Sequence, residues 1–308
     1  MTKRDGSSKV ATSCTDHGAQ TGQGHSMSGT SFAAISDRVK SVPFWWHSID
    51  LGEGIVTPGH KTRDILRQEL DLLRLPMMSG KSVLDIGAWD GFYSFEAEKR
   101  GAAKIVALDH YVWSMDIPAM TSYWSDCKDK GIVPQQYDAV PGLWQPDALP
   151  GKRGFDLAHE VLRSKVSSLV ADFTTVDLDA LGTFDITLYL GVLYHMQDPF
   201  GCLRRLARVT RELAVIETAA VCVPGFEARA LCEFYESNEL NADVSNWWAP
   251  SLTALLAMCR AAGFARIEVM STEPRPGRGR AMVDAVRGAL GLESQKPIGY
   301  RAIVHAWK

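Results

Sequence analysis

The segment Val83–Phe95 (VLDIGAWDGFYSF) combines a carboxylate with two glycines at a spacing suited to holding a ligand. An apolar run reaches Asp85, and Gly87 and Gly91 follow in the pattern D-x-G-x-x-x-G. Glycine lets a backbone turn sharply and approach a ligand closely. A strand, a glycine turn and a helix in this order place a ligand at the carboxyl edge of an open α/β sheet. The segment is therefore a candidate cofactor site.

Trp89 distinguishes this turn from the dinucleotide pattern G-x-G-x-x-G, because it occupies the place of the middle glycine. A pyrophosphate needs close approach at that glycine, so a nicotinamide cofactor is disfavoured. S-adenosylmethionine (SAM) has no phosphate. Its methionine ammonium needs a hydrogen-bond acceptor, which Asp85 or nearby carbonyls can supply.

Two further acids follow later strand patterns. Asp109 follows the run Lys104–Leu108, where a carboxylate can hold both ribose hydroxyls. Asp172 follows Val166–Ala171 and can accept a hydrogen bond from an adenine amino group, with Phe173 beside the ring. Each acid alone is equally well explained as a helix cap. Three acids at successive strand ends favour a cofactor site.

Strand and helix patterns alternate along the chain and predict the elements that position these acids. The expected strands are Ser82–Ile86, Lys104–Leu108, Val166–Ala171, Phe184–Leu190, Leu213–Glu217, Arg266–Ser271 and Arg301–Trp307. The expected helices are Ile35–Lys40, Thr62–Leu75, Gly91–Gly101, Val112–Lys130, Pro199–Thr210 and Ser251–Gly263. Such alternation predicts a parallel sheet with helices on both faces, and the last two strands suit an antiparallel edge.

Composition and charge limit the classes of partner. The net charge of −3 gives no broad attraction for nucleic acid. The six cysteines form no CxxC pair, so no metal site is expected, and they are typical of a reducing cytoplasm. No apolar run reaches the roughly 18 residues of a membrane span, and the N-terminus lacks a secretory apolar region. A cytoplasmic protein, as a monomer or a homo-oligomer, is expected.

The composition also predicts the domain organisation. Residues 1–30 are rich in Ser, Thr, Gly, Gln and His without any period, which is typical of a disordered tail. Residues 31–308 are expected to form a single domain. Within it we expect an N-terminal cap over residues 31–80 and an insertion over residues 110–165 that contains several tryptophans.

These motifs together resemble the class I SAM-dependent methyltransferases. The segments are VLDIGAWDGFYSF, VALD, VADF and FDITLYLGVLYHMQDP, in that order. Tyr189–Pro199 and Trp46–Gly59 resemble the family of the wobble-uridine tRNA carboxymethyltransferase and its small-molecule relatives. The resemblance covers roughly residues 40–275. It implies a Rossmann-like, mostly parallel sheet of seven strands, with helices on both faces and one antiparallel strand near the edge.

The resemblance also implies which residues contact the cofactor. They are Asp85, Gly87, Ala88 and Gly91 around the methionine part, Asp109 with His110 at the ribose, Asp172 and Phe173 at the adenine, and Leu190 and Gly191 beside the sulfonium. The tRNA enzyme uses a carboxylated SAM, held by basic groups and a tyrosine that Tyr194 matches. Candidate basic partners are Arg275, Arg278 and Arg280. The aromatic Phe44–His47 replaces the basic entry expected of that enzyme.

Methyl transfer is an in-line displacement, in which an enzyme positions the nucleophile and removes a proton where needed. His195, just past the fourth strand, is a candidate base; alternatively it is structural and bonds the Asp198–Pro199 turn. His47 is a second candidate base, or else a surface histidine beside a tryptophan. Tyr194 and Glu217 complete the catalytic candidates, although Glu217 also suits a capping or core role.

Three functions remain open. The first is methyl transfer from SAM to the O, N or C atom of a small molecule, in specialised metabolism. The second is modification of a tRNA wobble uridine, which requires a local basic patch. The third is SAM binding for regulation without catalysis. The acceptor, and plain or carboxylated SAM as donor, are open as well.

Overall fold

The computed structural model describes residues 29–274 and 297–308, with side chains from residue 33 onward. The expected tail therefore lies outside the described residues except at its last two positions, and Arg275, Arg278 and Arg280 lie outside them as well. The helices are α1 (Gly29–Ser41), α2 (Arg63–Leu73), α3 (Phe92–Lys99), α4 (Tyr111–Ser114), α5 (Ile117–Asp129), α6 (Arg153–Leu162), α7 (Leu178–Leu181), α8 (Pro199–Val209) and α9 (Leu252–Ala262). Short 3-10 turns are η1 (Tyr137–Ala139), η2 (Pro150–Lys152) and η3 (Leu193–His195).

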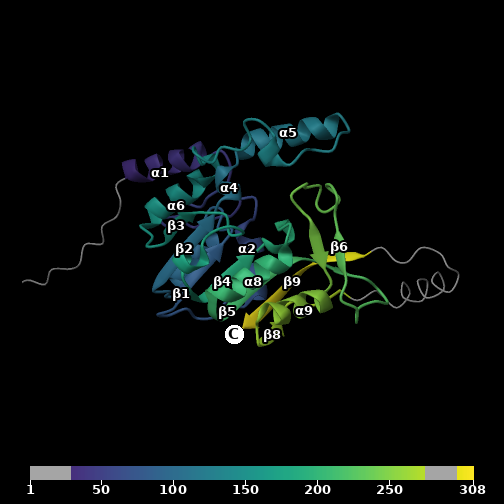
Figure 1. Ribbon diagram of the computed structural model, residues 1–308. Coiled ribbons are helices and arrows are strands. Elements are labelled where there is room, and N and C mark those ends of the chain that lie inside the picture. The colour runs from purple at the N-terminus through teal and green to yellow at the C-terminus, as the bar shows by residue number, and fades with distance from the viewer. Residues whose placement is uncertain (1–28, 275–296) are drawn as a thin grey trace, which may run out of the picture.

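A seven-stranded sheet forms the centre of the molecule (Figure 1). Its strands are β1 (Ser82–Ile86), β2 (Lys104–Asp109), β3 (Ser167–Val170), β4 (Phe184–Leu190), β5 (Thr210–Cys222), β8 (Arg266–Val269) and β9 (Ile298–Trp307). They are arranged in the order β3-β2-β1-β4-β5-β9-β8. Strands β1 to β5 are parallel, and β9 is antiparallel to both of its neighbours, β5 and β8. The predicted Rossmann-like sheet is confirmed.

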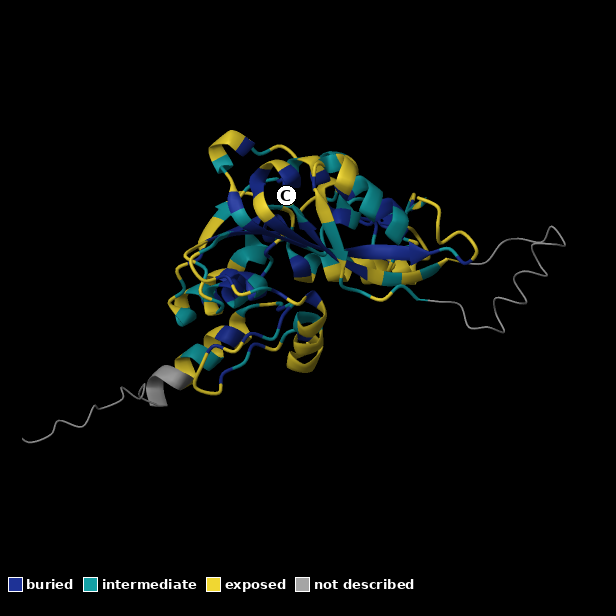
Figure 2. Ribbon diagram, turned by 90° about the horizontal axis from the view of Figure 1, so that it is seen from below, coloured by how far each residue is buried: buried dark blue, intermediate teal, exposed yellow. Residues whose placement is uncertain are grey.

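Two hydrophobic cores cover the two faces of the sheet, because successive side chains of a strand point to opposite faces. Val83 and Val215 pack in one core with α2, α3 and α6. Leu84 and Ile216 pack in the other with α8 and α9. Figure 2 shows the strands as a dark blue, buried layer between helices with exposed outer surfaces. This burial on both faces explains why the strands read as continuous apolar runs.

Local signals explain where the helices begin. Thr62 caps α2 through the Ile65 amide, and Asp198 caps α8 through the Gly201 amide at 2.8 Å. A side-chain acceptor at this position satisfies an amide that has no partner inside the helix. Pro199 occupies the first position of α8, where its missing N–H costs nothing.

A third, smaller cluster lies where four separate segments meet beyond the carboxyl edge of the sheet. We call it the roof cluster; its buried members are Met115, Ile117, Tyr137, Leu143 and Val244. Phe44 from the segment after α1 and Trp89 from the turn after β1 pack against it. In Figure 1, α4 and α5 lie at the top, toward the two-stranded sheet of β6 (Cys232–Phe234) and β7 (Trp248–Pro250).

The structure corrects several expected elements. Val112–Lys130 is divided into α4 and α5, because the chain is extended at Met115 and Asp116, and Asp116 starts a new helix by capping Ala119. Glu217 does not end its strand: β5 continues to Cys222, since antiparallel β9 pairs with it beyond the end of β4. The sequence analysis missed α6, whose apolar face packs on the core.

Three further features concern membrane spans, cysteines and metal ligands. None of the helices in the described residues is long and apolar enough to span a membrane. Of the five cysteines that the structure describes, four are buried and Cys232 is exposed. Within the described residues, no three histidine, cysteine, aspartate or glutamate side chains are grouped as metal ligands.

Candidate active site

The turn after β1 forms the floor of the candidate site. The Asp85 carboxylate is 2% exposed and accepts a hydrogen bond from the Ser94 hydroxyl at 2.6 Å. Burial raises the pKa of Asp85 to about 6, opposed in part by the Ser94 hydrogen bond. Gly87 and Ala88 donate their amides to the Leu108 carbonyl, which ties the turn to the end of β2.

Gly87 is required by both conformation and space. Its φ is +78°, and a Cβ atom would lie 2.6 Å from Cγ2 of Val192. We expect Gly87→Ala to destabilise the fold by about 1–3 kcal/mol, because it adds left-handed strain to a steric clash. Urea unfolding measures this. The double variant Gly87→Ala/Val192→Ala should recover the part due to the clash; recovery of the whole loss would contradict the strain argument.

Asp109, at the end of β2, is the second carboxylate of the site and is 3% exposed. Its two oxygens accept hydrogen bonds from the backbone amides of Trp89 at 2.9 Å and Val112 at 3.1 Å. Burial raises the pKa of Asp109, and these backbone bonds oppose the shift. Asp109 therefore links the β1 turn to α4, and its repulsion raises the pKa of Asp85 further.

Asp90 fastens the N-terminal segment to the β1 turn. Its carboxylate accepts the backbone amides of Trp46 at 2.9 Å and His47 at 2.8 Å, and also bonds Nδ1 of the His47 ring. His47 is 4% exposed and stacks on Phe92 with 5.3 Å between ring centroids. The expected surface histidine is therefore wrong: His47 is buried beside the turn. A carboxylate that accepts Nδ1–H leaves Nε2 as the ring acceptor.

Trp89 adopts an unusual conformation for a bulky residue, with φ of +49°. Its ring lies parallel to that of Trp46, with 4.7 Å between centroids. The Trp89 amide donates to the Asp109 carboxylate, and the Trp89 carbonyl accepts from the ring N–H of Trp113. These contacts on both sides of the residue hold the backbone in a costly conformation. The tryptophan in place of the middle glycine thus joins the turn to the N-terminal segment.

The end of β4 brings two of the expected residues, Tyr194 and Glu217, together beside Gly191. A Cβ atom there would lie within 4 Å of Arg301, Tyr194 and Glu217. Arg301 donates two hydrogen bonds to the Glu217 carboxylate, and its guanidinium lies 4.7 Å from the centre of the Tyr194 ring. Burial raises the pKa of Tyr194, and the cation opposes this shift. Leu190, the last residue of β4, packs against the first core.

His195 follows Tyr194 in η3. Nδ1 of its ring lies 2.9 Å from the Ser245 hydroxyl and 3.1 Å from the Ser245 carbonyl. The alternative of a bond to the Asp198–Pro199 turn is wrong, since Asp198 caps α8 instead. Burial lowers the pKa of His195, so the ring is neutral at neutral pH.

The remaining expected cofactor residues lie at the ends of β2 and β3. The Asp172 carboxylate accepts hydrogen bonds from the amide and hydroxyl of Thr174. The Phe173 ring is 5% exposed and packs in the second core against Tyr189. His110 precedes α4, and its ring contacts Trp144 edge-on at 5.1 Å. Gly91 has φ of +86°, and a Cβ there would lie 2.7 Å from Phe155.

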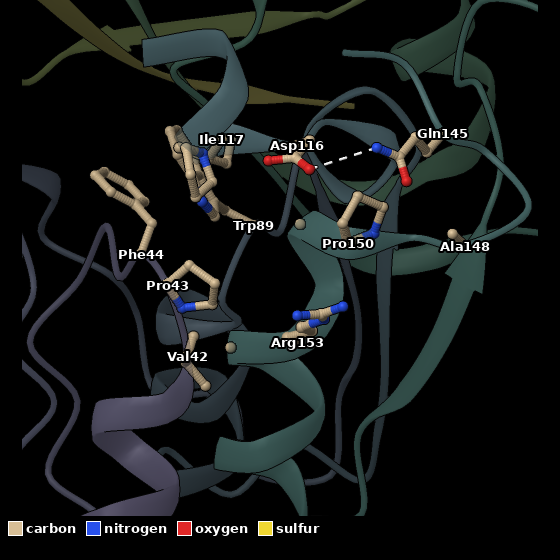
Figure 3. A pocket seen from close by; sticks show the side chains of 13 residues that line it. Val42, Pro43, Phe44, Trp89, Asp116, Ile117, Gln145, Ala148, Pro150 and Arg153 are labelled. Carbon is tan, nitrogen blue, oxygen red and sulfur yellow. Dashed lines mark hydrogen bonds between the residues drawn. The ribbon is translucent and has the colours of Figure 1, made fainter. Parts of the chain in front are cut away.

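A cavity of about 110 Å³ lies beside Trp89 (Figure 3). Phe44 and Trp89 line one side, and Asp116, Gln145 and Arg153 line the other. Ligand pockets for molecules of drug size occupy roughly 300–1,000 Å³. The cavity is therefore too small for a nucleoside cofactor and is separate from the residues at Gly191.

The charges of the site test whether SAM fits it. Asp85 and Asp109 are buried carboxylates, and within the described residues neither accepts a hydrogen bond from a lysine or arginine side chain. A ligand with an ammonium and a sulfonium relieves the cost of burying them, whereas a pyrophosphate would add like charge. Within the part of the chain that the structure describes, Ser94 is the one side-chain donor to Asp85, so the carboxylate retains acceptor capacity for an ammonium. The residues present fit SAM.

Comparison with solved structures agrees with this geometry. The chain superposes on the N-terminal domain of EvdMO1, crystallised in the presence of SAH and D-fucose, with a TM-score of 0.54 and 19% identity over 93% of this chain and 99% of that chain. The same domain with SAH bound gives 0.54 and 18% identity over 90% and 96%. The chain has the fold of the class I SAM-dependent methyltransferases.

Sequence comparison finds distant relatives and matches no family model. The chain is 23% identical to the tRNA U34 carboxymethyltransferase of Alteromonas mediterranea over 194 residues, 63% of this chain and 47% of that protein. It is 34% identical to that of Aliarcobacter butzleri over 90 residues, 29% of this chain and 28% of that protein. The aligned parts span about half or less of these relatives. The resemblance to the carboxymethyltransferase family is thus confirmed at this distance.

Sequence reasoning missed several residues that this methyltransferase fold brings to the site. Asp90 stands inside the glycine turn, but nothing local indicates that it binds a segment more than forty positions earlier. Arg301 was read only as the start of a strand. Asp243 and Ser245 lie in a stretch without periodicity, and only their contact with His195 reveals them.

Proposed function

We propose that this protein is a SAM-dependent methyltransferase that acts on a small molecule. The observation that carries the proposal is the pair of buried carboxylates, Asp85 and Asp109, at the carboxyl edge of the sheet. When bound, SAM supplies a methyl group on a positively charged sulfonium. Asp85 accepts from the ammonium, and Asp109 accepts from the ribose. Because Gly191 has no side chain, it leaves room for a ligand beside the end of β4.

In this proposal His195 removes a proton from the acceptor. It is the last residue of η3, which begins two positions after Gly191, and its lowered pKa keeps it neutral and able to accept a proton at neutral pH. Tyr194 and the Arg301–Glu217 pair form the neighbouring wall. Because Glu217 is fully engaged by Arg301, we assign it to positioning rather than to proton transfer.

A small acceptor suits the way this edge of the sheet is covered. The roof cluster joins four parts of the chain beyond the carboxyl edge of the sheet: the segment after α1, the turn after β1, the insertion after β2 and the segment before β7. The net charge of −3 also gives little attraction for a polyanion. We therefore favour an organic substrate of specialised metabolism. D-fucose, present with the EvdMO1 domain, is a suitable first acceptor to test.

A second candidate function is modification of a tRNA wobble uridine with a carboxylated SAM. One observation favours it: Arg301 lies over Tyr194, the pairing of cation and tyrosine that the resemblance implies. The ion pair with Glu217 weighs against it, since it already offsets the charge of Arg301. This candidate predicts tRNA binding that weakens steeply with salt. No tRNA affinity at low salt would eliminate it.

Mass spectrometry of the ligand that copurifies with the protein tests the donor, and a screen with labelled methyl groups tests the acceptor. SAM or SAH with methylation of a small molecule would support the proposal. Carboxylated SAM would support the tRNA function. SAM binding without turnover on any acceptor would indicate a regulatory role, and a nicotinamide cofactor would overturn both enzyme functions.

Asp85→Asn should weaken SAM binding by about 10–100-fold, because a charge-assisted hydrogen bond contributes about 1.5–3 kcal/mol. With the pKa of Asp85 at about 6, affinity of the native protein should fall as the pH drops below 6, since a protonated carboxyl no longer pairs with the ammonium. Calorimetric titration across pH measures both effects. Asp179→Asn, at an exposed ion pair, is the matched control. An unchanged affinity in Asp85→Asn would contradict this assignment.

A further inference from the structure

The His195 ring is held from one side by a segment that is fifty positions away in sequence. Nδ1 lies 2.9 Å from the Ser245 hydroxyl and 3.1 Å from the Ser245 carbonyl oxygen. A carbonyl only accepts, so its contact favours a proton on Nδ1. In a neutral imidazole, Nε2 is then the nitrogen with the free lone pair.

The serine hydroxyl is oriented in turn by a carboxylate. Ser245 donates its hydroxyl to Oδ1 of Asp243 at 2.8 Å, and its backbone amide donates to the same oxygen at 2.9 Å. Because the hydroxyl proton goes to Asp243, the oxygen lone pair of Ser245 faces Nδ1. The chain of contacts Asp243–Ser245–His195 therefore favours a single tautomer.

The chain of contacts Asp243–Ser245–His195, which we call the relay, is held in place by the insertion that follows β2. The Tyr137 hydroxyl donates to Oδ1 of Asp243 at 3.3 Å, and Nε2 of the Gln136 side chain donates to the Val244 carbonyl at 2.6 Å. Tyr137 and Val244 are both buried in the roof cluster. The Trp247 amide donates to the Tyr194 carbonyl at 2.8 Å, which fixes η3 against the same segment.

We propose that Asp243 and Ser245 are positioning residues that hold His195 as its Nδ1–H tautomer, with Nε2 as the nitrogen that accepts the acceptor's proton. This rests on the proposed function for the role of His195, but the tautomer itself does not depend on any ligand. The charged and titratable groups that face the ring are Asp243, Arg301 and Tyr194. Asp243 favours the protonated ring, and Arg301 disfavours it.

Two-dimensional ¹H–¹⁵N NMR of protein labelled at its eight histidines distinguishes the tautomers, because bare and protonated ring nitrogens differ strongly in ¹⁵N shift. The His195 signals are assigned by their loss in His195→Asn. In the native protein without ligands we expect an Nδ1–H ring. Asp243→Ala should introduce the other tautomer, since the freed Ser245 hydroxyl can then donate to Nδ1. An Nε2–H ring in the native protein, or an unchanged tautomer in folded Asp243→Ala, would overturn the inference.

Asp243→Asn provides a second variant that keeps an acceptor for the Ser245 hydroxyl. We expect it to retain the tautomer but to lower the pKa of His195 in the NMR titration, because the neighbouring negative charge is lost. An unchanged pKa of His195 in Asp243→Asn would count against the relay. Once an acceptor is known, Asp243→Ala should lower kcat by about 10-fold or more with the KM for SAM unchanged. Failure of the native protein to bind SAM would overturn the proposed function and leave the tautomer result standing, so the two failures are distinguishable.

Discussion

His195→Asn is expected to slow methyl transfer by about 10²–10⁴-fold, the usual contribution of a general base, while SAM still binds. Asparagine keeps an N–H donor near the position of Nδ1, so its bond to Ser245 can persist. It has no counterpart of Nε2. The measurement is kcat with the acceptor found in the labelled-methyl screen, together with the calorimetric affinity for SAM.

The pH dependence separates a base from a structural residue. Burial lowers the pKa of His195, so the ring should stay neutral at pH values below the ordinary histidine pKa. As the pH is lowered, the rate of the native protein should therefore fall only at a more acidic pH, where the ring becomes protonated. The residual rate of His195→Asn should lack that titration. His159→Gln is the control, since His159, on α6, bonds the Val166 carbonyl just before β3, and glutamine can keep that bond. Native kcat in His195→Asn would show that the acceptor needs no base here.

Asp90→Ala should lower the free energy of unfolding by about 3 kcal/mol. The substitution leaves two backbone amides, of Trp46 and His47, and the His47 ring nitrogen without their acceptor. Each buried donor without a partner costs about 1–3 kcal/mol, partly recovered where water reaches it. Chemical denaturation followed by circular dichroism and tryptophan fluorescence measures the loss.

Controls can show whether this loss arises from the hydrogen bonds of Asp90. Asp90→Asn keeps an oxygen for the two amides and should lose less stability. Asp37→Ala, which removes an exposed carboxylate on α1, should have no measurable effect. Equal stability of Asp90→Ala and the native protein would mean that the N-terminal segment is held by its aromatic contacts, such as the Trp46–Trp89 stack, and not by the carboxylate.

The central sheet was predictable because its signals are local. Buried parallel strands are continuous apolar runs, and β1, β4 and the glycine turn were predicted at or very near their observed bounds. Glu217 was placed wrongly at a strand end, since the apolar pattern does not reveal how far an antiparallel neighbour prolongs a strand. The break between α4 and α5 was missed because Asp116 acts through a cap rather than through periodicity.

The sequence by itself determined the fold class and the choice of SAM over a dinucleotide. The fold class follows from the alternation of strand and helix patterns along the chain, and the cofactor follows from residues within a few positions of one another: a carboxylate, two glycines and a tryptophan in the middle glycine's place. Only the tertiary structure decided which groups surround the reacting end of the site. Asp90 contacts His47, Arg301 contacts Tyr194, and Ser245 contacts His195, and the residues of each pair are more than forty positions apart in the sequence. Such contacts depend on how loops fold over the sheet edge, and loop packing leaves no periodic trace in the sequence.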